Sequence, residues 1–160
     1  MAEIADLVTE LDAARDAFHE ALEDVDVDLV TVPGVVGDWS VRDLVVHVAA
    51  WAEHAVAALA LASAGHGEEF AYSTDQTDAM NEDILVAGRA LAPREALERE
   101  DAAFGAFREA VVALEPGLLA ARLGNGDSVE GVIRYDGPDH YAEHTEHLRS
   151  WFGDDPPDEG

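Results

Sequence analysis

The sequence predicts an all-α protein, an up-and-down four-helix bundle with room for one extra short helix. Apolar residues recur at three- and four-residue steps along most of the chain, which is the spacing of an amphipathic helix. Gly- and Pro-containing turns divide this pattern into helix-length segments, and no segment alternates as a half-buried strand does. At 160 residues the chain is the size of one domain. We therefore expect residues 1–152 to form a single bundle domain and residues 153–160, which are acidic and Pro-rich, to form a disordered tail.

The first predicted helix ends before a Pro-Gly loop at Thr31–Gly34. Its apolar stripe consists of Ile4, Leu7, Val8, Leu11, Ala14, Phe18 and Val25. The second helix begins at Ser40, which can cap it with Asp43 as the capping-box partner, and it runs to about Ser63. Its buried stripe consists of Leu44, His47, Trp51, Ala55 and Ala58.

Three further helical segments are predicted in the second half of the chain. The third runs from about Asp75 to Ala90, with an apolar face formed by Met80, Ile84, Ala87 and Leu91. The fourth opens at Pro93, a residue favoured at the first helical position, and its inward residues are Leu97, Phe104, Phe107, Val111 and Leu114. The last begins at Ser128 and is broken or kinked at Gly137-Pro138. Short and medium connections favour an up-and-down bundle, with an extra helix between the third and the last.

The charge of the chain is strongly acidic. Asp and Glu total 35 against nine basic residues, all of them Arg, which gives a formal net charge of −26. Such self-repulsion works against a compact state at ordinary salt and is screened at molar salt. The composition resembles cytosolic proteins of extreme halophiles, and we favour that interpretation over an ordinary acidic protein from a GC-rich genome. No basic stripe is available for a phosphate backbone, so nucleic acid is not an expected partner, although a mimic of nucleic acid would share this charge.

The chain carries no cysteine, so disulfides, thiolate metal sites and a Cys nucleophile are excluded. Its first residues are acidic and lack the basic region of a signal peptide. The most apolar stretch, Leu44–Leu61, is interrupted by His47, Glu53 and His54, which favours a buried helix over a membrane span. We expect a soluble, cytoplasmic protein with no membrane partner.

Histidines are the most informative residues. His140 and His144 lie four residues apart, share a helical face and could grip one metal ion with His47 from the second helix. His54 lies seven residues beyond His47, about 10.5 Å along a helix, which is too far to share that ion. Spacing alone does not choose between the pair His140 with His144 and the pair His144 with His147. The remaining two, His19 and His66, are predicted to be solvated.

A lone histidine on an apolar face is usually a core residue bonded to a backbone carbonyl. Burial of three imidazoles without a common purpose would be costly, which favours a metal site. Three nitrogen ligands leave coordination positions open, which is typical of a metal that does chemistry. Zn, Ni and Fe all suit imidazole ligands.

Two segments resemble the DinB/YfiT-like superfamily. The first is Asp38–Leu44 followed by His47 and Trp51, and the second is Ser128–Ile133 followed by Asp139–His144. The resemblance implies a four-helix bundle, often homodimeric. It also implies a divalent metal held by His47, His140 and His144. Gly137-Pro138 departs from the uninterrupted last helix of the family, and this break affects the direction in which the His140 side chain points.

Several relatives in this superfamily are S-transferases that use a low-molecular-weight thiol in detoxification or stress response. The resemblance therefore implies a metal-dependent S-transferase with a small-molecule substrate. Metal-dependent hydrolysis and non-catalytic sequestration of a small molecule or metal are the alternatives. Trp51 is predicted either to line the cavity beside His47 or to pack in the core. No Ser-His-Asp set, phosphate loop or dinucleotide fingerprint is present.

Overall fold

The computed structural model describes residues 3–152, which form helices and loops without a β-strand. The α-helices are α1 (Ile4–Glu23), α2 (Val41–Ser63), α3 (Thr77–Gly88), α4 (Pro93–Val112), α5 (Val129–Asp136) and α6 (Pro138–Phe152). Short 3-10 turns are η1 (Val27–Leu29), η2 (Gly67–Glu69), η3 (Thr74–Gln76) and η4 (Pro116–Ala120). The predicted all-α class is therefore confirmed. The tail expected at residues 153–160 lies outside the described residues.

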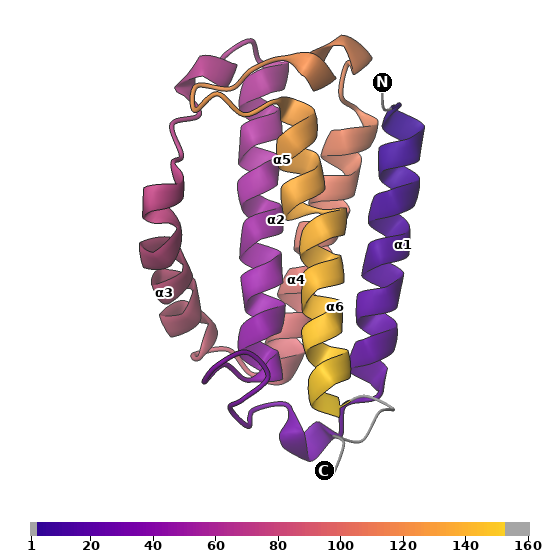
Figure 1. Ribbon diagram of the computed structural model, residues 1–160, viewed down its shortest axis with the longest axis vertical. Coiled ribbons are helices and arrows are strands. Elements are labelled where there is room, and N and C mark those ends of the chain that lie inside the picture. Colours follow the sequence, from indigo (N-terminus) through magenta and orange to yellow (C-terminus); the bar gives the residue numbers. More distant parts are fainter. Residues whose placement is uncertain (1–2, 153–160) are drawn as a thin grey trace, which may run out of the picture.

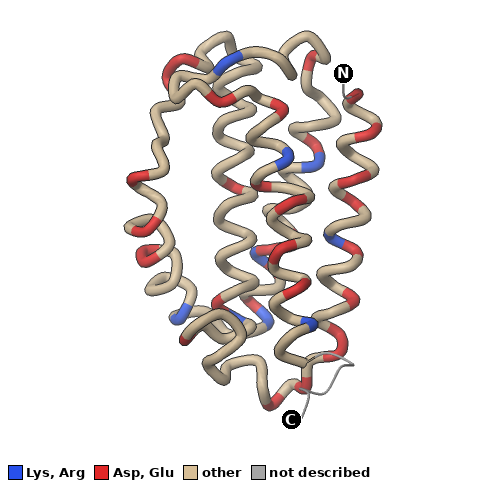
Figure 2. The backbone as a smooth tube through the Cα atoms, in the orientation of Figure 1, with Lys and Arg blue, Asp and Glu red and all other residues tan. Residues whose placement is uncertain are grey.

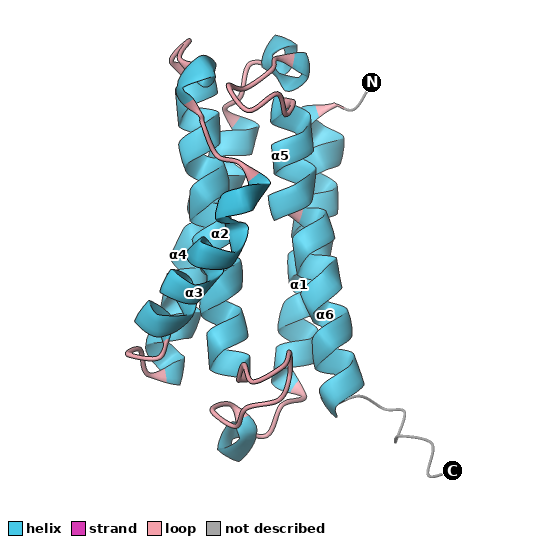
Figure 3. Cartoon of the chain, turned by 60° about the vertical axis from the view of Figure 1, so that its left-hand side comes forward, coloured by secondary structure: helices cyan, strands magenta, loops and turns pink. Residues whose placement is uncertain are grey.

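From α1 to α5 each α-helix reverses the direction of the one before it, and α6 continues in the direction of α5, so that α5 and α6 form one interrupted fourth member of the bundle (Figure 1). α1 packs beside α6, and α2 packs beside α4. The extra helix is α3, which packs on the outside of α2 and connects two helices that point the same way (Figure 3). The sequence predicts the extra helix between the third segment and the last. The helix at that place, α4, is instead a full member of the bundle. The difference follows from the narrow apolar face of α3, on which only Leu85 and Gly88 are buried.

α2 is the central helix, and its predicted bounds and stripe are confirmed. The Ser40 hydroxyl accepts from the Asp43 backbone N–H at 3.2 Å, and the Ser40 N–H donates to the Asp43 carboxylate at 2.9 Å. This capping box fixes where the helix begins. α2 is long and apolar enough to span a membrane, with a mean hydropathy of 1.7, but 61% of that window is buried in the bundle. A central core helix meets the same criterion, so this feature is weak support for a span.

The predicted inward faces of α3 and α4 are partly wrong. On α3, Ala87 is exposed while Leu85 is buried. The face that packs on α2 is therefore rotated by about one residue from the predicted face. On α4, Leu97 is 43% exposed, and Ala96 and Glu100 are buried instead. Sequence patterning treats a glutamate as a surface residue, and here that assumption fails.

Glu100 is fully buried and holds α1, α4 and α6 together. Arg15 donates to both of its carboxylate oxygens at 3.0 Å, and the Tyr141 hydroxyl donates to it at 2.7 Å. His19 contacts the same carboxylate at 2.8 Å, so the expectation that His19 is solvated is wrong. Burial alone would raise the pKa of Glu100, but hydrogen bonds from His19, Arg15 and Tyr141 lower it to about 2.

The junction of α5 and α6 depends on Gly137. A Cβ placed there would collide with the backbone carbonyl oxygen of Ile133 and would lie 3.1 Å from a methyl of Leu11. Pro138 then starts α6, since a proline has no N–H to donate and suits a first helical position. The predicted break is confirmed, and it makes α6 a separate helix that carries His140 near its start.

Candidate metal centre

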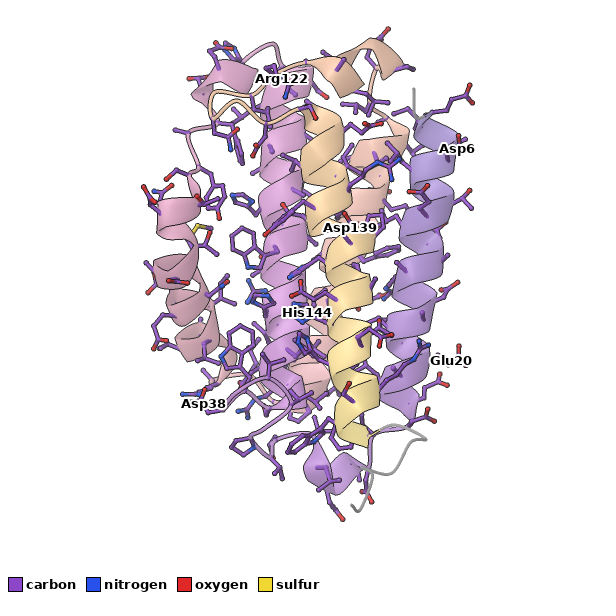
Figure 4. The ribbon with its side chains drawn as sticks, viewed as in Figure 1. Asp6, Glu20, Asp38, Arg122, Asp139 and His144 are labelled. Atoms are coloured by element: carbon purple, nitrogen blue, oxygen red, sulfur yellow. The ribbon has the colours of Figure 1, made fainter. Side chains whose placement is uncertain are left out.

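Three histidine side chains from α2 and α6 converge in the interior. The Nε2 atom of His140 lies 3.0 Å from Nε2 of His47 and 3.0 Å from Nε2 of His144. One ligand nitrogen from each ring lies within 4.8 Å of the others, and all three residues are buried. Figure 4 shows His144 on α6 at the side that faces α2. The structure thus brings together the three histidines that the resemblance implies as ligands.

The two distances of 3.0 Å suit a shared cation. Two nitrogens bonded to one ion at about 2.0–2.1 Å can lie no more than about 4.2 Å apart. Hydrogen bonding explains the arrangement less well, because a ring nitrogen offers one in-plane position, either a proton or a lone pair. The Nε2 atom of His140 therefore cannot form good hydrogen bonds with both neighbours at 3.0 Å. A cation can accept all three lone pairs at once, so the residues present fit a metal ion.

The three imidazoles are held in the neutral form that binds metals. Burial lowers the pKa of His47 to about 3, with a further decrease from His140. Burial lowers the pKa of His140 to about 4. Burial, followed by His140, His47 and His147, lowers the pKa of His144 to about 2. A metal would therefore not have to displace protons from these rings at neutral pH.

Neighbouring rings orient the ligands. The Nδ1 atom of His147 lies 3.1 Å from Nδ1 of His144, on the far side of that ring from His140. His147 is therefore placed to orient His144, and it is absent from the set of three. Trp39 packs on His47 with ring centroids 4.7 Å apart. The Nδ1 atoms of His47 and His140 are buried and have no hydrogen-bond partner among the described residues.

Trp51 separates the three-histidine cluster from a second feature. Its ring centroid lies 6.5 Å from that of His47 and 4.9 Å from that of His54. Beyond it, His54 and Asp136 line a cavity of about 360 Å³. His54 lies outside the metal set, as its spacing from His47 predicted. Asp136 was not predicted as a site residue, because a helix-terminal Asp gives no signal of burial in the sequence.

A second group of potential ligands, His66 with Glu68 and Glu69, lies at the η2 turn, which His66 precedes. All three side chains are exposed, with His66 at 59%. Exposed acidic groups commonly adopt such spacing without an ion, so this group does not indicate a metal site.

The family model for the mycothiol maleylpyruvate isomerase N-terminal domain matches residues 8–148. A crystal structure of an uncharacterised protein from Escherichia coli UTI89 superposes with a TM-score of 0.78 at 17% sequence identity. The similarity covers 92% of this chain and 91% of that chain, and at this identity it supports the fold alone. No curated protein sequence matches the chain.

Proposed function

Because the chain belongs to the mycothiol maleylpyruvate isomerase N-terminal domain family, a DinB/YfiT-like family, we propose that it is a metal-dependent S-transferase that uses a low-molecular-weight thiol. The observation that carries the proposal is the convergence of three buried imidazole nitrogens at one point. Detoxification or stress response is the setting we propose for this activity.

In this proposal His47, His140 and His144 hold a divalent ion, with Zn, Ni and Fe as the candidates. When bound, such an ion lowers the pKa of a coordinated thiol and so supplies a sulfur nucleophile at neutral pH. The chain has no cysteine, so the thiol must come from a small molecule. The thiol named in the family description, mycothiol, is the first candidate.

The protein itself provides a water-poor, preorganised site. His47, His140 and His144 are all buried, and Trp39 and Trp51 lie beside His47. His147 contacts Nδ1 of His144 and so restrains the orientation of that ring. In the transfer the thiol sulfur forms a bond to an electrophilic carbon. With a haloaromatic, halide leaves with its electron pair and the thiol proton goes to solvent; with an epoxide, the C–O bond breaks and its oxygen takes that proton.

The test follows the loss of an electrophile, a haloaromatic or an epoxide, with metal-loaded protein in the presence and absence of mycothiol. Consumption that needs both metal and thiol supports the transferase. Consumption with metal and water alone replaces it with a hydrolase, because the same ion also lowers the pKa of bound water. Tight binding without product would favour a sequestration protein. The variant His66→Ala, which is altered outside the cluster of His47, His140 and His144, should consume the electrophile as the wild type does.

A further inference from the structure

The cavity beyond Trp51 lies between α2 and α5 and has a volume of about 360 Å³, within the range of small-molecule sites. One wall is aromatic, with His54 surrounded by Trp51, Phe70 and Tyr72 at ring-centroid distances of 4.9, 5.1 and 4.8 Å. The opposite wall is α5, where Gly131 contributes no side chain and leaves room. The cavity is therefore lined by aromatic rings that an organic ligand can contact.

Asp136 is the buried polar group of this cavity, with an exposed fraction of 4%. Among the described residues its side chain has one polar contact, Nδ1 of His54 at 3.5 Å. A carboxylate can accept about four hydrogen bonds. One long contact therefore leaves most of the hydrogen-bonding capacity of the Asp136 carboxylate unused. Burial raises the pKa of Asp136, and Asp127 raises it further, against a decrease from His54.

The charges around the cavity favour a positive ligand. Asp127 and Asp136 both line it, against one basic residue, Arg122, which already donates to the carbonyl oxygen of Gly126 at 3.1 Å. Acidic positions also far outnumber basic ones along the described backbone (Figure 2), consistent with the net charge of −26. Such a field attracts cations and repels anions.

We propose that this cavity binds a small organic ammonium ion, whose N–H groups donate to Asp136 while its apolar body packs on the aromatic wall. Aromatic faces attract such cations through their ring quadrupoles. An anion would meet two carboxylates here, and a neutral aromatic molecule without a donor would leave Asp136 with only its long contact to His54. The site requires neither a bound metal nor the transferase reaction.

The test is calorimetric titration of metal-free protein, kept in EDTA, with benzylamine at a pH where the amine is protonated. We expect saturable binding to the wild type, and binding weaker by about tenfold or more for Asp136→Asn, which loses a charge-assisted hydrogen bond. Asp139→Asn is the matched control, since Asp139 is exposed and lies outside the cavity, and it should bind as the wild type does. Benzyl alcohol and benzoate, which keep the ring and remove or reverse the charge, should bind more weakly than benzylamine.

A second pair of variants tests the aromatic wall and does not depend on the folding of Asp136→Asn. Tyr72→Leu should weaken benzylamine binding by about threefold or more, while Tyr72→Phe, which keeps the ring, should not. Thermal melts of every variant confirm that folded protein is compared. The proposal is overturned if benzylamine does not bind the wild type, if benzoate binds as tightly, or if the folded variants Asp136→Asn or Tyr72→Leu bind it unchanged.

Discussion

The Nε2 atoms of His47 and His140 lie 3.0 Å apart although 93 positions separate the two residues in the chain. α2 presents the first because its capping box sets the start of that helix, and α6 presents the second because Gly137 and Pro138 restart the last helix. Two local sequence signals therefore set where each histidine lies on its helix, and packing of α6 against α2 brings the two together.

Replacement of His144 by Ala should abolish binding of a divalent metal while the helix content stays near normal. Two remaining imidazoles hold an ion much less tightly than three, and a buried Ala in place of His leaves the backbone of α6 intact. Elemental analysis of protein purified without an affinity tag measures the stoichiometry. His66→Ala should retain the metal. An unchanged metal content in the His144→Ala variant would show that the site is misassigned.

Replacement of Glu100 by Gln should destabilise the bundle by about 3 kcal/mol at neutral pH, because the part-buried Arg15 would lose its buried carboxylate partner and keep only the exposed Asp101. The folded pKa of Glu100 is about 2 against an ordinary 4.5. Its contribution is therefore fully present above pH 4.5 and is lost as the pH falls toward 2. Urea unfolding at several pH values gives the difference in the free energy of unfolding between wild type and Glu100→Gln. The titration of other carboxylates affects both proteins and largely cancels in this difference.

The matched control for Glu100 is Glu98→Gln on the same helix. Glu98 is 63% exposed and pairs with Arg94 at the surface, so its replacement should change the free energy of unfolding very little. A stability gap between wild type and Glu100→Gln that stays constant between pH 5 and pH 2.5 would contradict the assigned role of the carboxylate.

Periodicity and helix signals predicted much of this fold. The capping residue Ser40, the break at Gly137 and the inward stripe of α2 each depend on local sequence, and each is confirmed. The resemblance to the DinB/YfiT-like superfamily is also confirmed by the family match. An i, i+4 pair shares one helical face, which pointed to a metal site, but the set of His47, His140 and His144 was chosen by the family resemblance.

Features that depend on packing between helices could not be predicted. Glu100 is buried because Arg15, His19 and Tyr141 from other helices complete its hydrogen bonds, and a single-helix pattern contains no such information. The pairing of His54 with Asp136 likewise arises only when α5 packs on α2. Spacing left His147 as an alternative ligand. Only the structure shows that it contacts Nδ1 of His144, the ring nitrogen that does not face His140.

Replacement of Gly137 by Ala should destabilise the protein by about 1–3 kcal/mol, because the new methyl would collide with the Ile133 carbonyl oxygen. The matched control is Gly105→Ala in α4, where a Cβ meets nothing within 4 Å. That variant should be more stable than the wild type by about 0.5–1 kcal/mol, since Ala favours a helix interior. Chemical denaturation measures both, and equal effects of the two variants would contradict a steric requirement at residue 137.

Thermal stability should rise steeply with salt. Arginine pairs such as Arg108 with Asp12 and Arg134 with Glu10 neutralise only a few of the 35 acidic residues, and the remaining charge repels itself across the surface. The Debye length falls from about 10 Å at 0.1 M to about 3 Å at 1 M, which removes most of that repulsion. Salt also weakens the exposed ion pairs, but these contribute little individually, so screening of the repulsion dominates. Melts in KCl and NaCl at matched ionic strength should give the same increase in Tm, since screening depends on ionic strength and not on the cation. A Tm independent of salt would exclude the halophilic interpretation of the composition.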